Sequence, residues 1–385
     1  MKFLFVGQGY PQVEGTTSGS GVGTYVYEIC QGLLARGHSC DVIVWQEGPG
    51  SPPSRQNIEG VTVHLLTHSY WPIIEKLAPE SREVSTLRHL VQRLNADQAY
   101  DWIEIQSEEG IAIGCQKDFP QQVILRVHTT LAQMIQFKQI PIGWRERYRL
   151  HRERRSFTIA RWVVTHSHAH AESLRKDYQI QGEIYVVPHG IGIPTSYSLS
   201  KAIPTKKPTV LIIGTADLRK GIDRVRPVME AFAQTGEEVC FRVITSNPQK
   251  TARLLSADQG WPRGIEVQID SGLSPEEMEW AYRSADVVFH PARYESFGLT
   301  CIEPARYGTP LVATNVGIVP DLLTGELTRY IVDGDRPNEC AKALENAIAD
   351  REKLGTLLRA RYEAEFTRDR MIDNYLSILH SFASR

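Results

Sequence analysis

Short apolar runs alternate with helix-patterned segments along almost all of the 385 residues, and this alternation constrains the fold more than any other feature. Residues 2–6 form a short apolar run, a Gly-rich stretch follows, residues 22–34 carry apolar side chains at helical spacing, and residues 41–45 are the next strand-like run. Strand, loop, helix and strand in this order are typical of a parallel α/β sheet. Gly37 stands just past the helical pattern and predicts where that helix stops.

The alternation occurs in two series, separated by residues 188–208, which are rich in proline and serine and predict a linker. The first series continues with strand-like runs at 61–66, 102–105, 123–127, 162–165 and 184–187. The second series has them at 210–213, 241–244, 265–269, 287–289, 311–313 and 330–332. Each half is therefore predicted to be its own doubly wound α/β unit. Residues 368–382 predict an amphipathic final helix.

Composition narrows the function classes. The chain is 42% hydrophobic and 23% charged with a formal net charge of −2, so it is globular and has no excess positive charge to attract nucleic acid. The N-terminal apolar run is too short for a signal peptide core, and no stretch approaches the roughly 20 apolar residues of a membrane span. Six scattered cysteines without metal-ligand spacing predict reduced thiols. We expect a cytoplasmic protein.

The strongest chemical signal is Glu-Ser-Phe-Gly-Leu-Thr-Cys-Ile-Glu, which runs from Glu295 to Glu303 just after a predicted strand. Ligands of open α/β sheets bind at the carboxyl ends of strands. Gly298 lets a backbone approach a ligand, and a helix starting near Leu299 would present free amides to a phosphate. The two carboxylates could accept hydrogen bonds from ribose and sugar hydroxyls. The alternative is that both are solvated charges near a helix N-terminus.

A second signal is the pair Arg219-Lys220, followed by Gly221, in the loop after the strand at 210–213. A diphosphate leaving group gains negative charge as its bond to the sugar breaks, and adjacent cations stabilise that charge. The alternative is an exposed charge pair in front of a helix.

The N-terminal half offers weaker signals. The Gly-rich loop at 15–23 could bind a phosphate or admit a sugar. Gly7 and Gly9 start a dinucleotide fingerprint, but Gln12 stands where its third glycine belongs, so a hydride-transfer enzyme is discounted. His128, at the end of the strand at 123–127, could bond a sugar hydroxyl or move a proton, although by itself such a residue is more often a structural histidine.

Residues 144–155 carry six arginines against two glutamates. Such a segment could meet acidic lipid head groups or a phosphorylated acceptor. It has no clean apolar face, so a solvated helix is the leading interpretation, and a peripheral contact with the inner membrane surface stays open.

Together these segments resemble family 4 of the retaining glycosyltransferases, which have the GT-B architecture. The resemblance covers nearly the whole chain. It is carried by Gly-Val-Gly-Thr-Tyr-Val-Tyr-Glu-Ile at 21–29, Ala-Arg-Gly-His at 35–38, Val-Pro-His-Gly-Ile at 187–191, the Arg-Lys-Gly loop, the two glutamates, and Tyr-Gly-Thr-Pro-Leu-Val-Ala-Thr at 307–314.

The resemblance implies a fold of two Rossmann-like domains facing a central cleft. Residues 1–190, joined by a C-terminal helix at 366–385 that crosses back, would form the acceptor side, and residues 191–365 would bind the nucleotide sugar. It also implies roles for the site residues. The diphosphate would be held by Arg219, Lys220 and Gly21 and by the amides of Leu299 and Thr300, the ribose by Glu303, and the sugar by Glu295, the Phe297-Gly298 backbone and His128.

The activity that follows is transfer of a hexose-type sugar, with retention, from a nucleotide-diphosphate donor to a saccharide, lipid-linked or small-molecule acceptor. A UDP-sugar is expected before a GDP-sugar. No cofactor or metal is expected, because the cations and helix amides replace a metal ion. No nucleic acid is expected as a partner, because the chain has no excess positive charge. The alternatives are a nucleotide-sugar epimerase or phosphorylase of the same fold, and a protein that only binds a nucleotide sugar.

Overall fold

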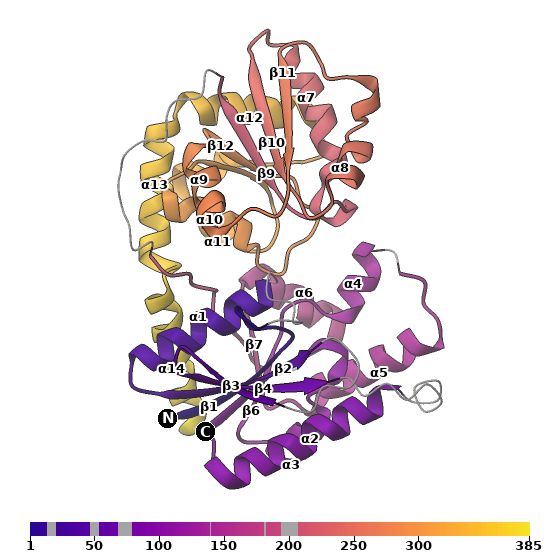
Figure 1. Cartoon of the computed structure of the whole chain (residues 1–385), viewed down its shortest axis with the longest axis vertical. Helices are drawn as coiled ribbons and strands as arrows, with labels where there is room; N and C mark the ends of the chain where they lie inside the picture. Colours follow the sequence, from indigo (N-terminus) through magenta and orange to yellow (C-terminus); the bar gives the residue numbers. More distant parts are fainter. Residues whose placement is uncertain (14–20, 47–53, 68–78, 139, 181, 194–206) are drawn as a thin grey trace. The chain divides into compact units, whose positions relative to one another are not determined.

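A computed structural model describes residues 1–13, 21–46, 54–67, 79–138, 140–180, 182–193 and 207–385. These residues divide into two compact units, each an α/β sheet with covering helices (Figure 1). Unit 1 comprises Met1–His166, His170–Gly192 and Arg368–Arg385, and unit 2 comprises Ser167–Ala169 and Ile193–Thr367. The predicted linker lies mostly at 194–206, outside the described residues.

The sheet of unit 1 has the strand order β3-β4-β2-β1-β5-β6-β7-β8. Its strands are β1 (Lys2–Gly7), β2 (Ser39–Gln46), β3 (Ser54–Ile58), β4 (Val61–Thr67), β5 (Trp102–Gln106), β6 (Val123–Arg126), β7 (Trp162–Thr165) and β8 (Ile184–Val186). All neighbouring strands are parallel except β3 and β4. Parallel strands are covered on both faces, which is why they read as continuous apolar runs.

The sequence pattern did not predict β3. This strand is polar and mostly exposed, so it carries neither a continuous apolar run nor a clear alternation. A hairpin makes it, because Ile58 pairs with Val61 and the two residues between them, Glu59 and Gly60, have φ of 49° and 86°. Two positive φ values are the signature of the tight hairpin turn that matches the strand twist.

Helices cover this sheet: α1 (Gly21–Ala35), α2 (Pro79–Gln98), α3 (Ile113–Asp118), α4 (Leu131–Lys138), α5 (Trp144–Ile159), α6 (His168–Tyr178) and α14 (Arg368–Ala383). The stop predicted for α1 is confirmed. Gly37 has φ of 76°, and the amide of His38 donates to the carbonyl of Leu33 over 3.1 Å. A left-handed glycine that lets following amides reach back to late carbonyls is a common helix ending.

The final helix α14 belongs to unit 1 and packs beside α1 (Figure 1). Its apolar face is buried through Ile372 and its neighbours. Arg368 pairs with the buried carboxylate of Glu28 on α1, and Arg36 donates to Asp373 over 2.8 Å. The prediction that the C-terminal helix crosses back to the N-terminal domain is confirmed. These contacts hold the end of the chain against α1.

Unit 2 has the strand order β11-β10-β9-β12-β13-β14, with all pairs parallel. Its strands are β9 (Thr209–Ile213), β10 (Val239–Ile244), β11 (Ile265–Asp270), β12 (Val287–His290), β13 (Leu311–Thr314) and β14 (Ile331–Val332). Its helices are α7 (Val225–Ala233), α8 (Pro248–Leu254), α9 (Pro275–Ser284), α10 (Leu299–Tyr307), α11 (Val319–Leu322), α12 (Pro337–Ala349) and α13 (Arg351–Glu365).

Among the parallel strands of each sheet the order reverses once, between β1 and β5 in unit 1 and between β9 and β12 in unit 2. Loops diverge at such a switch point, and ligands of open α/β sheets bind there. The predicted α/β class with two doubly wound sheets is confirmed, and the switch points mark where each unit can hold a ligand.

The contact of α1 with α14 predicts that Gly32→Ala destabilises unit 1 by about 1–3 kcal/mol, because overpacking a close helix contact displaces both partners. A Cβ at Gly32 would lie 2.4 Å from Cγ1 of Ile372. Chemical denaturation of the two purified proteins measures the change. Gly182→Ala is the control, since a Cβ there meets nothing within 4 Å. Equal stability of the Gly32 variant and the parent would contradict the contact.

Candidate functional site

A buried carboxylate lies at the switch point of unit 2. Glu295 follows β12, and its side chain is only 8% exposed. Its Oε1 bonds Nζ of Lys220, and its Oε2 lies 3.6 Å from a guanidinium nitrogen of Arg219, both from the loop after β9. Nε2 of His290 lies 3.4 Å from Oε1. The structure therefore brings Glu295 together with the Arg219-Lys220 pair, which the sequence predicted as two separate signals.

The charges decide the state of this carboxyl group. Burial by itself would raise the pKa of Glu295, but Lys220, His290 and Arg219 outweigh it and hold the pKa well below the usual range. Glu295 is therefore ionised at neutral pH. The two cations keep 17% and 16% of their side chains exposed, so they can still reach an incoming anion.

The cationic loop depends on a glycine. Gly221 has φ of 70°, and a Cβ there would lie 2.0 Å from the carbonyl oxygen of Pro291. Only a residue without a side chain lets the loop press this closely on the end of β12. On its other side, Oδ1 of Asp217 accepts the amide of Lys220 over 3.0 Å, which caps the short 3-10 turn Leu218–Lys220.

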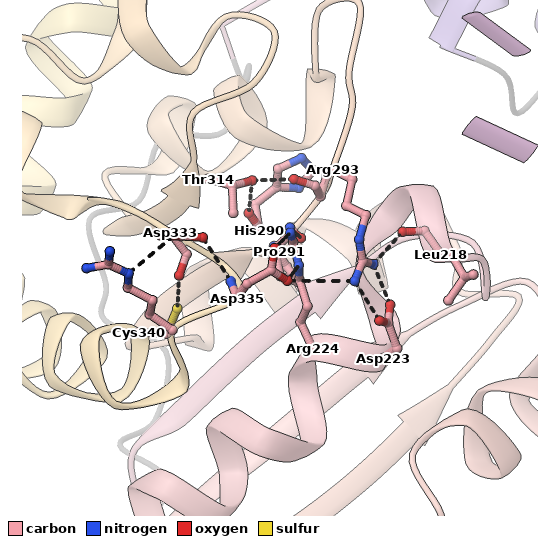
Figure 2. A network of polar contacts seen from close by, with 12 residues as sticks. Leu218, Asp223, Arg224, His290, Pro291, Arg293, Thr314, Asp333, Asp335 and Cys340 are labelled. Carbon is pink, nitrogen blue, oxygen red and sulfur yellow. Dashed lines mark hydrogen bonds and ion pairs between the residues drawn. The ribbon is translucent and has the colours of Figure 1, made fainter. Parts of the chain in front are cut away.

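Two further arginines hold the loop in place (Figure 2). Arg293 donates to both carboxylate oxygens of Asp223 over 2.7 Å and to the carbonyl of Leu218 over 2.8 Å. Arg224 donates to both oxygens of Asp335 and to the carbonyl of Pro291. Planar two-point pairs of this kind fix direction as well as distance. The loop therefore reaches the site already oriented.

The turn between the two glutamates opens helix α10. Gly298 is its N-cap with φ of 96°. Leu299 and Thr300 are in the first turn, where amides have no acceptor within the helix, so this end favours an anion. Glu303 lies further along, and burial raises the pKa of its carboxyl group. Its Oε2 accepts a short hydrogen bond from the hydroxyl of Tyr282.

Phe297 holds the turn in place from within the protein. Its ring is buried, and its carbonyl accepts the amide of Ile318 over 2.7 Å. Gly317 makes this approach possible, because a Cβ there would lie 2.2 Å from the same carbonyl oxygen. The Phe297 side chain and carbonyl thus anchor the turn.

Sequence reasoning missed three groups at this site. His290 ends β12 and its Nδ1 lies 3.3 Å from the hydroxyl of Thr300, so it links Glu295 to the start of α10. Tyr282 reaches Glu303 from α9, and Arg293 orients the cationic loop. Only His290 and Arg293 could have been suspected from the sequence, because they lie close to the end of a predicted strand. Tyr282 gave no such signal, because it is distant in sequence from Glu303.

Unit 1 has a pocket at its own switch point. It has a volume of about 160 Å³ and is lined by Gln8, Val22, Gln106, Ser107, Glu108, His128, Thr129 and Met134. Predicted Gly21 is the exposed first residue of α1, next to the lining residue Val22. The rest of the predicted Gly-rich loop, residues 15–20, lies outside the described residues.

Behind this pocket His128 belongs to a cluster of buried rings. Its Nδ1 lies 2.9 Å from Nε2 of His166, and the His166 ring stacks on His189 at 3.9 Å. Burial first, and then nearby positive groups including Arg126, hold the pKa of all three imidazoles well below the usual range. The cluster is therefore neutral at physiological pH.

One ring nitrogen from each of these three histidines lies within 4.8 Å of the others, which raises the question of a metal ion. The rings do not fit one. Stacked His166 and His189 have planes only 26° apart, so their lone pairs run side by side rather than converging on a tetrahedral centre. Arg126 donates to Nδ1 of His166 over 2.9 Å and adds positive charge. The cluster is built for hydrogen bonding.

Comparison with known proteins agrees with the geometry. The model of Glycosyltransferase Family 4 matches residues 19–193, and the model of Glycosyl transferases group 1 matches residues 196–364. The chain is 24% identical to a D-inositol 3-phosphate glycosyltransferase of Xylanimonas cellulosilytica, over 87% of this chain and 85% of that protein. It is 42% identical to the same enzyme of Paenarthrobacter aurescens over 95 residues, which span only 23% of that relative's length.

Among solved structures, sucrose-phosphate synthase from Thermosynechococcus elongatus superposes with a TM-score of 0.80, at 22% identity and over 100% of both chains. An α,α-trehalose-phosphate synthase (UDP-forming) from Burkholderia xenovorans gives 0.72 at 14% identity, over 98% of this chain and 99% of that one. Two doubly wound units of this kind form the GT-B fold, and the two matching family models identify the chain as a glycosyltransferase. Within that class, the chain belongs to the family 4, group 1 glycosyltransferases.

The ion pairs of Glu295 predict that Glu295→Gln destabilises the protein by about 3 kcal/mol at pH 7, because it leaves two largely buried cations without their counter-charge. Since the folded pKa is depressed, the contribution of Glu295 is complete above the unfolded pKa of about 4.3 and is lost as the pH falls further. The gap between variant and parent should thus be constant from pH 7 to 5 and narrow below that range.

Urea unfolding at a series of pH values measures this gap. Glu363→Gln is the matched control, because Glu363 pairs with Arg359 over 2.6 Å but is 53% exposed. Its loss should cost less than about 1 kcal/mol. A Glu295→Gln gap that stays the same at pH 4 and pH 7 would contradict an ionised, depressed Glu295.

Proposed function

We propose that this glycosyltransferase moves a hexose-type sugar from a UDP-sugar to its acceptor with retention of configuration and without a metal ion. The observation that carries the proposal is the convergence of Arg219, Lys220 and ionised Glu295 beside the N-terminus of α10. Two cations and helix amides meet a diphosphate, while a carboxylate next to them accepts hydrogen bonds from sugar hydroxyls.

In this scheme Arg219 and Lys220 stabilise the charge that develops on the departing diphosphate, as a metal ion would otherwise do. The amides of Leu299 and Thr300 add to this at the helix end. Glu303 accepts hydrogen bonds from the ribose hydroxyls after exchanging its bond with Tyr282. Gly21 is assigned a contact with the diphosphate as well.

Retention is proposed to proceed by front-face attack, with the leaving phosphate removing the acceptor proton. Glu295 does not fit the role of general base, because neighbouring cations hold its pKa far below neutrality. It fits the role of a hydrogen-bond acceptor for the sugar, helped by the Phe297-Gly298 backbone. We assign no protein nucleophile.

The names of the similar proteins support the choice of partners. The trehalose-phosphate synthase in the comparison is UDP-forming and was solved with glucose-6-phosphate, and the similar sequences act on D-inositol 3-phosphate. We therefore place UDP before GDP as the donor nucleotide. For the acceptor, we propose a phosphorylated small polyol or sugar as the small-molecule candidate, in addition to a saccharide or a lipid-linked acceptor.

A nucleotide-sugar epimerase or phosphorylase of the same fold, and a protein that only binds its nucleotide sugar, are the competing functions. If the protein converted a nucleotide sugar to its epimer with no acceptor present, the epimerase function would replace the transferase function. Binding of the donor with no product from any acceptor would favour the binding protein.

The donor is identified by thermal unfolding of the protein with a panel of UDP-, GDP- and ADP-sugars, with and without EDTA. The true donor at 100 times its dissociation constant should stabilise the protein by about 2.7 kcal/mol, and EDTA should leave that shift unchanged. Loss of the shift in EDTA would overturn metal independence.

For transfer, Lys220→Ala should lower kcat/KM by at least about a hundredfold, because it removes a cation that acts on the charge of the leaving group. Lys250→Ala on α8 is the control, an exposed lysine in the same unit. The anomeric configuration of the product is read by NMR. Full activity of Lys220→Ala would reject the assignment of Lys220 to the donor site. A product with the inverted anomeric configuration would overturn retention.

We also propose that the exposed face of α5 formed by Trp144, Tyr148 and Arg155 contacts an anionic membrane surface. In the part of the chain that the structure describes, no helix is long and apolar enough to cross a membrane. Trp144 and Tyr148 are 60% and 44% exposed, and Arg155 follows at helical spacing. Aromatic rings beside exposed arginines suit the lipid head-group region. The opposite face of α5 buries Arg152 and Glu153, so it was not visible as an apolar stripe.

The double variant Trp144→Ser/Arg155→Glu should bind phosphatidylglycerol vesicles about tenfold more weakly than the parent, at roughly 1 kcal/mol for each basic residue near the surface. Vesicle co-sedimentation measures the binding. Trp280→Ser, which removes another exposed tryptophan, should bind as the parent does. Equal binding of all three proteins would show that α5 is a solvated helix.

A further inference from the structure

A chain of hydrogen bonds in unit 1 runs from a buried cation to the pocket at its switch point. It starts at Arg126, the last residue of β6, whose side chain is fully buried. One of its guanidinium nitrogens donates to the carbonyl of Val187 over 3.1 Å and to Nδ1 of His166 over 2.9 Å. Its guanidinium also lies 4.4 Å from the ring centre of Tyr25. These contacts hold the cation in one place.

The direction of each bond follows from the chemistry of the groups. A guanidinium group has donors only, so Nδ1 of His166 must accept. A neutral imidazole that accepts at one nitrogen carries its proton on the other, so Nε2 of His166 is the donor. That nitrogen lies 2.9 Å from Nδ1 of His128, which therefore accepts. The proton of His128 is then on its Nε2.

We propose that Arg126 and His166 are positioning residues that fix His128 as a hydrogen-bond donor at Nε2. Among the described residues Nε2 of His128 has no hydrogen-bond partner, and His128 lines the 160 Å³ pocket. A fixed N–H donor recognises an oxygen with lone pairs, such as the hydroxyl oxygen of a sugar or polyol. The identity of that ligand rests on the proposed function, but the state of the histidine does not.

The burial of His128 and the positive charge beside it favour the neutral form of its ring. Burial is the main cause of its lowered pKa, and the positive charge of Arg126 lowers that pKa further. The neighbouring rings of His166, His189 and His170 have lowered pKa values too, and Tyr25 has a raised one. Glu104, bonded to Tyr25 over 2.8 Å, has a pKa raised by burial. His128 therefore presents a neutral ring with its donor at Nε2.

The decisive experiment reads the tautomer directly. Nitrogen-15 NMR of histidine-labelled full-length protein at pH 7 distinguishes an imidazole protonated at Nε2 from one protonated at Nδ1 or at both. Parent protein should show His128 protonated at Nε2 alone. His166→Phe keeps a buried ring but removes the relay, so His128 should become a mixture of tautomers. His166→Gln can accept from Arg126 and donate onward, and should restore the parent signal.

His170→Phe is the matched control, since His170 is equally buried but bonds Thr165 and Gln133 rather than His128. It should leave the His128 signal unchanged even if stability falls. A His128 that is protonated at Nδ1 or charged in the parent overturns the proposal. So does a His166→Phe variant with the parent's His128 signal, or a His166→Gln variant that matches His166→Phe.

Transfer kinetics give the functional consequence. His166→Phe should lower kcat/KM by about three- to tenfold, the size of one hydrogen bond, and His166→Gln should recover most of it. Recovery of the tautomer without recovery of kcat/KM would overturn the positioning role. Absence of transfer in the parent, with the tautomers as expected, would instead reject the proposed function and leave the relay intact.

Discussion

The site of unit 2 depends on one carboxylate that is buried and yet remains ionised. Glu295 can stay charged because Lys220 and Arg219 reach it from a different loop. A buried charge without partners would take up a proton instead. The geometry of the cationic loop is therefore a condition for the charge of the carboxylate, and the two halves of the motif have to be explained together.

That condition accounts for much of the surrounding backbone. Gly221 lets the loop approach Pro291, and Gly317 lets the next loop approach Phe297. At both positions a Cβ would overlap a carbonyl oxygen. Arg293 then ties the loop to the end of β12 by bonds to Asp223 and Leu218 (Figure 2). A site preorganised in this way does not have to order its charges when the substrate arrives.

The sequence was informative where one residue type has one physical use. The strands of both sheets were predicted because strands covered on two faces must be apolar, and the helix stop at Gly37 because a left-handed residue favours glycine. Strand β3 was missed because only its backbone pairing and a turn define it. The buried face of α5 was missed because Arg152 and Glu153 form part of it, which no hydrophobic pattern can show.

The site followed the same rule. Arg219, Lys220 and Glu295 were selected from the sequence because charged residues at strand ends are rarely needed for packing, and the structure brings their side chains together. Tyr282 could not be found, because it meets Glu303 only after α9 and α10 have packed together. Arg126 and His166 were not recognised either, since one reads as the end of a strand and the other as a residue before a helix. Contacts between distant segments carry no local signal.

Buried positive charge serves opposite purposes in the two units. Arg126 is fully buried, donates to a ring nitrogen and a carbonyl, and has the aromatic face of Tyr25 beside it. Its acceptors are neutral and its side chain has no exposed atoms to offer a ligand. Arg126 can therefore orient the groups around it but cannot bind an incoming anion. Lys220 and Arg219 are partly exposed and are paired with a charged group, so an incoming anion could share them with Glu295. A cation that must accept a new anion needs an exposed tip and an exchangeable partner, whereas one that sets a tautomer needs neither.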